Sequence, residues 1–244
     1  RIAAGTVSAR TPKVKDTGLK GGWGASAFFY KQMREIRRRS PLLFVNVSTL
    51  ILLAAVLFMG FVLRNAEDLS PNLIMMFMLC MGVYVLFFLN AAGEWGREIM
   101  KPYLYMVPAP PLKKLIWASL TSIIKPGLDG LIIFVIGGIL VKGSPLTVAV
   151  CIFMFFSFGC LFTASNILSQ RLLGQMANKG LIMVLYILLV LLLVLPGLLV
   201  GVVLYFVFHT PGAVMGIPVI LWNIGLSFGI YAICQNTLHN METH

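Results

Sequence analysis

Six long apolar stretches, each of about 20 residues or more, follow one another from Leu42 almost to the end of the chain. Short polar segments separate them. A bilayer core about 30 Å thick is crossed by an apolar helix of about 20 residues, so each stretch has the length of a membrane-spanning helix. The pattern predicts an all-α polytopic membrane protein with six transmembrane helices.

The polar segments set the expected limits of the spans. The sequence predicts spans at residues 42–63, 72–92, 112–141, 146–168, 181–208 and 214–234. Proline removes a backbone donor and clashes with the preceding helical turn. We therefore expect a kink at Pro126 and Gly127, which would divide the third span into residues 112–124 and 128–141. The fifth span is long, so we expect it to be tilted, or broken at Pro196 and Gly197.

The segment before the first span has a different pattern. Residues 1–22 are polar and basic with no apolar period, which is typical of a linker or tail. Residues 23–41 repeat apolar side chains at three- and four-residue spacing with basic side chains on the other side, which predicts an amphipathic helix in the membrane interface. The expected organisation is completed by a six-span domain at 42–238 and a tail at 239–244.

The distribution of basic residues predicts the orientation of the chain in the membrane. The chain has 19 Lys and Arg against eight Asp and Glu. Ten of these basic residues precede the first span, four lie between the second and third, and two follow the fourth, whereas only Arg64 and Lys142 lie in the alternate joints. By the positive-inside rule the basic side is cytoplasmic. We therefore expect both termini in the cytoplasm of a bacterial cell, and we interpret the net charge as a marker of topology, with no nucleic acid as a partner.

Motifs for catalysis or metal binding are missing from the sequence. It contains no phosphate-binding loop, no zinc-protease motif and no Cys-x-x-Cys pair. The four cysteines lie inside apolar spans and are expected to be small core residues: Cys80, Cys151, Cys160 and Cys234. We predict neither a catalytic group nor a metal site in this chain. Because it begins at Arg1 without a signal peptide, we expect it to be part of a longer polypeptide.

The joint between the second and third spans is the richest in charged and aromatic side chains. Glu94 and Arg97, like Glu98 and Lys101, stand three residues apart and can pair on a short helix, which Pro102 would end. A stiff, charged projection of this kind favours a docking element. An ordinary solvated loop with internal salt bridges is the alternative.

These residues resemble a known family. The acidic helix from Glu94, the run Lys101-Pro102-Tyr103-Leu104-Tyr105 and the helix that begins Lys113-Lys114-Leu115 are similar to membrane subunits of bacterial ABC exporters of the type-two permeases. The basic helix 28–39 with Ser40-Pro41 is similar to the interfacial helix of the same family. The resemblance is strongest over residues 22–138. The chain is shorter than a full member and is expected to be the C-terminal half of a permease.

The resemblance implies a function. The chain would be the permease of an ATP-driven exporter, moving a hydrophobic, amphipathic or peptide-like substrate outward by alternating access. Its partners would be a cytoplasmic ABC ATPase, a second six-span half or a second copy, and the bilayer. ATP and magnesium would be bound by the ATPase and no cofactor by this chain, which would not be an enzyme. The positions carried over as the cytoplasmic coupling helix and its surroundings are Glu94, Arg97, Glu98, Lys101, Pro102 and Tyr103.

Two charged residues fall within the third span. Asp129 follows Lys125 by four residues, so both lie on one helix face. An intramembrane charge is costly and is by default a functional hypothesis. We interpret Lys125 and Asp129 either as a structural pair that holds the third span or as a gating or cavity-lining pair. A mechanism in which Asp129 alone makes this chain an intramembrane enzyme is a weaker alternative.

Small and amide side chains inside the spans predict contacts between helices. Gly197–Gly201 and Gly225–Gly229 match the small-x-x-x-small spacing, so these glycines are expected to face protein. The amides are interpreted as interhelical hydrogen-bonders or border residues in preference to substrate ligands: Asn46, Asn90, Asn166, Asn223 and Gln235. A non-transporting membrane scaffold or sensor that docks a cytoplasmic partner remains the rival to the exporter.

Overall fold

The computed structural model describes residues 25–39, 46–64, 69–92, 110–173, 179–208 and 212–240. In these ranges the elements are all helices: α1 (Ser26–Arg39), α2 (Val47–Arg64), α3 (Pro71–Ala92), α5 (Pro111–Val141), α6 (Pro145–Leu173), α7 (Lys179–Phe208) and α8 (Gly212–Asn240). Six of them are long and apolar enough to cross a membrane, and α1 is the exception. The prediction of an all-α protein with six membrane spans is confirmed.

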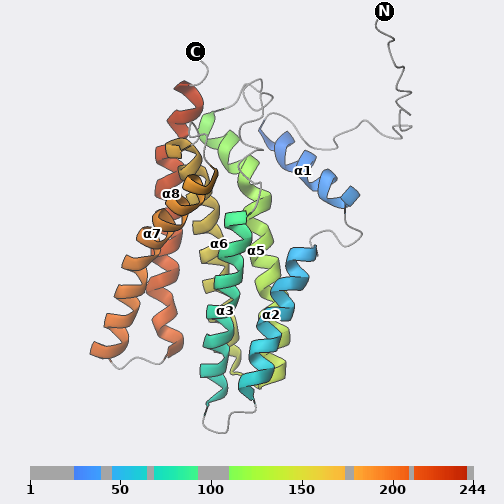
Figure 1. Cartoon of the computed structure of the whole chain (residues 1–244), viewed down its shortest axis with the longest axis vertical. Coiled ribbons are helices and arrows are strands. Elements are labelled where there is room, and N and C mark those ends of the chain that lie inside the picture. The colour runs from blue at the N-terminus through green and yellow to red at the C-terminus, as the bar shows by residue number, and fades with distance from the viewer. Residues whose placement is uncertain are drawn as a thin grey trace, which may run out of the picture.

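Helix α6 occupies the middle of the bundle (Figure 1). It packs against α5 and α3 on one side and against α8 and α7 on the other. The helices α7 and α8 form a pair at one side, while α2 packs on α3 and α5 at the other. Helix α1 lies across one end of the bundle and contacts α5. The sequence-predicted interfacial helix is therefore a separate element attached to the third span.

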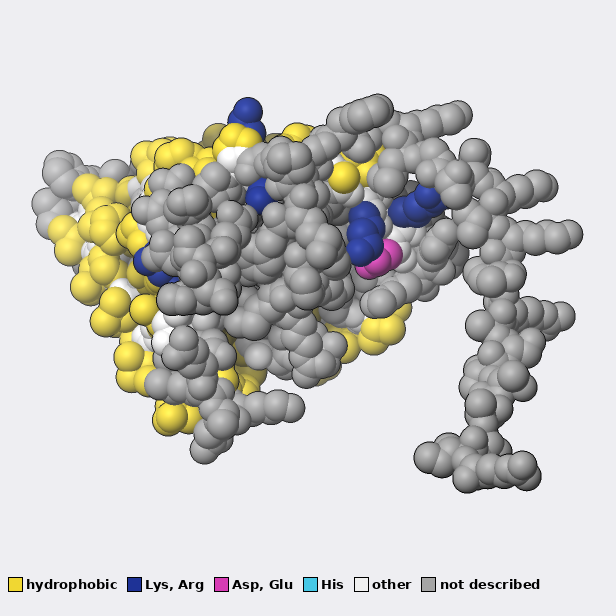
Figure 2. Space-filling model, turned by 90° about the horizontal axis from the view of Figure 1, so that it is seen from above, with side chains coloured by type: hydrophobic (Ala, Val, Ile, Leu, Met, Phe, Trp, Pro, Cys, Tyr) yellow, Lys and Arg dark blue, Asp and Glu magenta, His cyan; other side chains and the backbone are white. Residues whose placement is uncertain are grey.

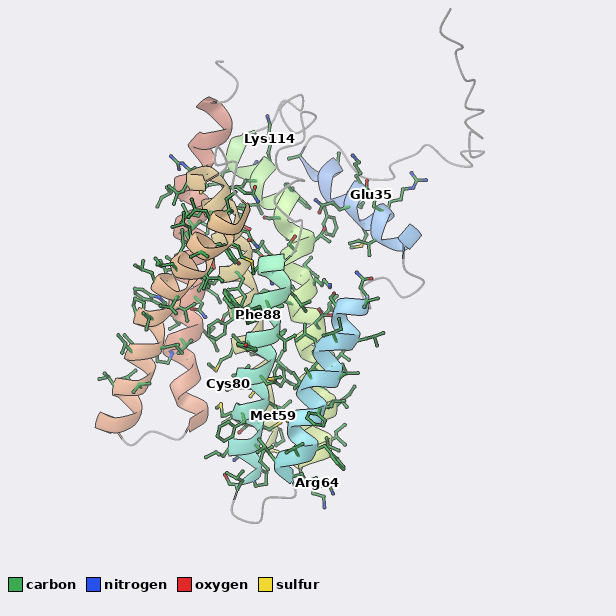
Figure 3. All side chains as sticks on the ribbon, viewed as in Figure 1. Glu35, Met59, Arg64, Cys80, Phe88 and Lys114 are labelled. Carbon is green, nitrogen blue, oxygen red and sulfur yellow. The ribbon has the colours of Figure 1, made fainter. Side chains whose placement is uncertain are left out.

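The two ends of the bundle differ in what they carry. Figure 3 shows Glu35 of α1 and Lys114 of α5 at one end and Arg64 at the other. Helices α6 and α8 finish at the first of these ends, which we call the α1 end (Figure 1). Seen from the α1 end, separate basic side chains lie among residues that are not described, and hydrophobic side chains lie along the edges (Figure 2). The described basic residues of α1 and those at the start of α5 and the end of α6 thus lie at one end.

The turn between α5 and α6 is built by its own sequence. Lys142 adopts a left-handed conformation with φ of 58° and ends α5, and its backbone N–H bonds the carbonyl of Gly138. The hydroxyl of Ser144 then accepts a hydrogen bond from the backbone N–H of Thr147 at 3.2 Å, and caps the start of α6. This geometry agrees with the tight turn that Gly143-Ser144-Pro145 suggests.

Several helices run past the expected limits. Helix α5 continues through Pro126, and α7 continues through Pro196, so neither helix is broken at its proline. Helix α8 extends to Asn240, beyond the span end expected at residue 234. The longer helices result because α6, which ends at Leu173, and α8 continue into the polar segments at the α1 end. The kinks at Pro126 and Pro196 and the tilt of the fifth span stay predictions.

Two apolar clusters hold the bundle together. The larger one joins α2, α3, α5 and α6 with residues of α7 and α8, and its most deeply buried side chains include Val56, Met75, Phe134 and Phe155. The smaller one joins α5, α6 and α8 nearer the α1 end, around Leu115, Leu161 and Ile230. Helices α5, α6 and α8 contribute to both clusters, so the two clusters connect the α2–α3 side to the α7–α8 side.

Candidate functional site: polar contacts inside the helix bundle

The predicted coupling residues lie in the joint between α3 and α5. All six of them fall at positions 93–109, outside the described residues: Glu94, Arg97, Glu98, Lys101, Pro102 and Tyr103. Their role stays a prediction. The described chain resumes at Pro110 and enters α5 at Pro111, so this joint is continuous with the helix that carries Lys125 and Asp129.

Lys125 and Asp129 both reach the first turn of α2. The Lys125 Nζ atom donates to the Ser48 hydroxyl at 2.6 Å. The Thr49 hydroxyl donates to the Asp129 Oδ1 atom at 2.9 Å. We call these four residues the charged contact. The spacing of Lys125 and Asp129 places them on one face of α5. In the structure this face contacts α2, and both side chains are hydrogen-bonded to residues of α2.

The cost of burying Asp129 is partly offset by its surroundings. Asp129 is only 2% exposed, and a buried carboxylate is costly unless it is paired and hydrogen-bonded. The Thr49 hydroxyl donates to it, and the oppositely charged ammonium group belongs to Lys125, one helical turn earlier on α5. The partial positive charge at the start of α2 also stabilises a nearby anion. A gating role for the pair stays a prediction.

The neighbouring face of α5 packs closely against α6. A Cβ atom added to Gly159 of α6 would overlap the Pro126 ring, and one added to Gly130 of α5 would lie 2.8 Å from Phe155. Gly127 similarly lies under the Phe156 ring. The absence of these Cβ atoms lets α5 and α6 approach closely around the proline. Pro126 and Gly127 therefore form part of a helix–helix contact as well as an expected kink.

Helix α1 is attached to the same helix α5. The Gln32 side-chain amide donates to the Ala118 backbone carbonyl at 2.9 Å. The rings of Phe29 and Trp117 pack with their centroids 6.0 Å apart. Ala118 precedes Lys125 by seven residues, about two helical turns. Helices α1 and α2 are thus fixed to successive parts of α5.

A second polar contact joins α6 and α8. The Asn223 Nδ2 atom donates to the Ser157 hydroxyl at 3.3 Å, and neither residue has measurable exposure. We call this pair the neutral contact. The interhelical hydrogen bond expected of Asn223 is confirmed. Asn90 differs, because its side-chain amide bonds the Leu86 carbonyl of its own helix.

The two glycine motifs have different surroundings. A Cβ atom on Gly197 of α7 would lie 2.5 Å from the Trp222 ring of α8, whose Nε1 atom donates to the Leu193 carbonyl at 3.1 Å. Gly197 therefore faces protein, as expected. Gly225 and Gly229 have open space at the Cβ position, so the expectation that they face protein is not met within this chain.

The four cysteines differ in their burial. Cys151, Cys160 and Cys234 are buried, but Cys80 is exposed on α3, so its assignment to the core is wrong. A pattern of apolar neighbours does not distinguish a core position from one that faces lipid. Among the described residues, no group of three or more His, Cys, Asp or Glu could hold a metal ion.

Sequence reasoning missed the partners of these polar residues. Ser48 and Thr49 lie within the first expected span and Ser157 within the fourth, so the apolar pattern does not single them out. Ser and Thr are frequent in membrane helices, where they bond the carbonyl one turn earlier. Paired Ser and Thr at the start of a span are a weak signal of a capped or contacting helix end. Nothing in the sequence connects Thr49 to Asp129, which lies 80 residues away.

Comparison with known proteins gives the family. A family model described as "Putative ABC exporter" matches residues 3–242. Neither the curated proteins nor the solved structures include a match to the chain. The family match reaches well beyond residues 22–138, where the resemblance is carried by recognisable motifs. Because it covers almost the whole sequence, we conclude that this multi-pass membrane protein belongs to that ABC exporter family.

Proposed function

We propose that this chain is the transmembrane permease component of an ATP-driven exporter. A separate ABC ATPase at the α1 end, in the cytoplasm, drives outward movement of a substrate by alternating access. ATP and Mg²⁺ are bound by that ATPase. The observation that carries the proposal is the family match over residues 3–242 in a chain with six candidate membrane spans.

The placement of charge supports the orientation. Exposed Lys31 and Arg34 of α1, Lys113 of α5 and Arg171 of α6 belong to the α1 end, whereas Arg64 lies at the opposite end. An excess of Lys and Arg in short joints favours the cytoplasmic side. An ATPase in the cytoplasm would then approach the α1 end, where the joint of residues 93–109 connects α3 to α5.

The contacts of α5 suggest how movement is transmitted. A force on the joint of residues 93–109 acts first on α5, because the joint leads directly into it. Helix α1 is attached to α5 through Gln32, and α2 through the charged contact. We infer that α1, α2 and α5 move together as a rigid group when the ATPase closes. Rigid-group movement around a fixed path is a common form of domain closure.

The composition of the spans favours an apolar or amphipathic substrate. The chain is 59% hydrophobic and its spans offer few hydrogen-bonding side chains, so a sugar would find few partners. A hydrophobic, amphipathic or peptide-like molecule fits better. A second six-span half or a second copy of this chain would complete the transport path.

The proposal is tested with the ATPase that co-purifies with the tagged chain. In lipid nanodiscs, the variant Arg97→Glu/Glu98→Arg should reduce ATP hydrolysis by the complex at least severalfold, because it reverses the charges offered to the ATPase. Arg64→Glu at the opposite end is the matched control and should leave hydrolysis unchanged. Hydrolysis that is equal in the wild type and in both variants would contradict the proposed coupling. Absence of any co-purifying ATPase would contradict the exporter itself.

A further inference from the structure

The neutral contact leaves one buried atom without a partner. The Ser157 hydroxyl donates its only proton to the Met154 carbonyl at 2.7 Å, so its oxygen can only accept from Asn223. In this arrangement the Asn223 NH₂ group faces Ser157. The Asn223 Oδ1 atom then points elsewhere, and it has no hydrogen-bond partner in the described part of the chain.

A buried acceptor without a partner calls for an explanation. Most buried polar atoms in native proteins are hydrogen-bonded, and leaving one unpaired destabilises the folded state. Leucine would fill a similar volume in an apolar bundle without this cost. Asn223 is 0% exposed, so bulk water does not satisfy it here. A carbonyl oxygen in this state is suited to an incoming N–H or O–H group.

The position of Asn223 in the membrane is suited to transport. It lies seven residues after Gly216 and eleven before Cys234, the two ends of its candidate span. Ser157 is also distant from both ends of its span, which runs from Pro145 to Leu172. Transporters that work by alternating access bind substrate near the middle of the bilayer, where both sides can reach it. The free acceptor is therefore at a depth where a transported molecule must pass.

The buried face of α8 continues this polar character. Asn223, Ser227 and Tyr231 follow one another at four-residue intervals, and all three are buried. The Ser227 hydroxyl donates to the Asn223 backbone carbonyl at 2.6 Å, so the backbone oxygen is already used. In this line the Asn223 Oδ1 atom and the Tyr231 hydroxyl are without a hydrogen-bond partner among the described residues. The three side chains form a polar line that runs along α8 from its middle toward the α1 end.

We propose that Asn223 is a substrate-binding residue whose Oδ1 atom accepts a hydrogen bond from an N–H or O–H group of the transported amphipathic molecule. This inference rests on the proposed exporter function and names a residue of its transport path. Binding requires that α8 move from α6 at this depth, which exposes the acceptor. Until then the Ser157 hydroxyl holds the Asn223 amide, so the Oδ1 atom is available when α8 separates from α6.

A pair of peptides tests the inference. The full chain in lipid nanodiscs is titrated with the methyl ester of dansyl-Leu-Leu-Leu and with the same ester N-methylated at all three leucine nitrogens, which removes every N–H donor. The wild type should bind the first peptide about tenfold more tightly than the second, the difference that one buried hydrogen bond supports. Binding is read from dansyl fluorescence.

Two variants separate a specific role from general damage. Asn223→Leu should bind both peptides equally, because it removes the acceptor and keeps the side-chain volume. Asn90→Leu is the matched control and should keep the tenfold preference, since the Asn90 amide bonds its own helix. Thermal unfolding of both variants reports whether they fold.

The outcomes distinguish the alternatives. Equal binding of the two peptides by the wild type, no binding of either, or an unchanged preference in Asn223→Leu would overturn the inference. The last of these is the result expected if water alone satisfies Asn223. The binding assay contains no ATPase. If the wild type prefers the unmethylated peptide but the ATPase assay shows no coupling, the proposed exporter function alone is contradicted. If the ATPase assay shows coupling but the wild type has no preference between the peptides, the role of Asn223 alone is contradicted.

Discussion

The charged contact and the neutral contact join helices in different ways. In the charged contact, two hydrogen bonds of 2.6 and 2.9 Å connect α5 to the first turn of α2, and both charged groups have partners. In the neutral contact, one hydrogen bond of 3.3 Å connects α6 to α8, and an acceptor stays unpaired. The comparison teaches that the polar groups of the α2–α5 joint satisfy one another, whereas the α6–α8 joint, which is extensively packed, keeps one buried acceptor unpaired.

The surroundings of α6 and α7 extend this difference. In the most apolar window of each helix, 61% is buried for α6 but only 17% for α7. Helix α6 is therefore the interior helix of the bundle, and α7 turns most of its surface to lipid or to another chain. Apolar composition alone does not distinguish these roles, because α7 is the more hydropathic of the two.

Removal of Asp129 should have the largest effect on stability. Asp129→Leu removes the acceptor of the Thr49 hydroxyl and the negative charge near Lys125, and it should lower the free energy of unfolding by about 3 kcal/mol. Reversible unfolding by SDS in mixed micelles measures it. The double variant Lys125→Met/Asp129→Leu should recover most of the loss, because an apolar pair replaces the ionic one. A double variant as unstable as Asp129→Leu would show that the charges do not act as a pair.

Filling the α5–α6 contact should have the next largest effect. Gly159→Leu forces a side chain into the Pro126 ring and should lower the free energy of unfolding by about 2 kcal/mol. Gly229→Leu, placed where the Cβ position is open, is the matched control and should change it little. Equal losses in the two variants, measured by the same SDS unfolding, would contradict the close approach of α5 and α6.

Replacement of Asn223 should have a small effect of either sign. Asn223→Leu loses the long bond to Ser157 and also removes an unpaired buried acceptor, so the free energy of unfolding should change by less than about 1 kcal/mol. Ser157→Ala leaves both ends of the Asn223 amide unpaired and should be the less stable variant. A loss of about 3 kcal/mol in Asn223→Leu would show that the neutral contact holds as firmly as the charged one.

The smallest effect is expected at Gly225. Gly225→Ala raises helix propensity without meeting a neighbour and should stabilise the protein by up to about 1 kcal/mol. The same variant distinguishes between two possible neighbours of this face of α8, the lipid and a second copy of the chain. If the face is lipid-exposed, size-exclusion chromatography in detergent will show no change in oligomeric state, whereas packing against a second copy would be weakened.

The spans and the family could be predicted from the sequence because both depend on long, continuous signals. Apolar length predicts spans directly, and the joint from Glu94 to Lys114 carries the family resemblance. The pairing of helices could not be predicted in this way. In a membrane both the interior and the lipid-facing surfaces are apolar, so Gly197 and Gly225 read alike although only Gly197 packs against a ring.

The polar residues show the same limit at closer range. The spacing of Lys125 and Asp129 predicts a shared face, but their partners Ser48 and Thr49 depend on where α2 begins beside α5. The amide of Asn223 predicts an interhelical bond, but its partner Ser157 depends on where α6 lies beside α8. The spacing of residues along one helix determines which side chains share a face. Tertiary packing determines which helix this face contacts.

Labelling of a single cysteine from the two sides of the membrane tests most directly whether the α1 end faces the cytoplasm and the ATPase. Tyr103→Cys is introduced after the four native cysteines are replaced by serine or alanine, and Ser70→Cys at the opposite end is the control. With a membrane-impermeant maleimide, Tyr103→Cys should be labelled in inverted vesicles and not in intact spheroplasts, and Ser70→Cys the reverse. Labelling of Tyr103→Cys in intact spheroplasts alone would contradict the orientation and the ATP-driven mechanism that depends on it.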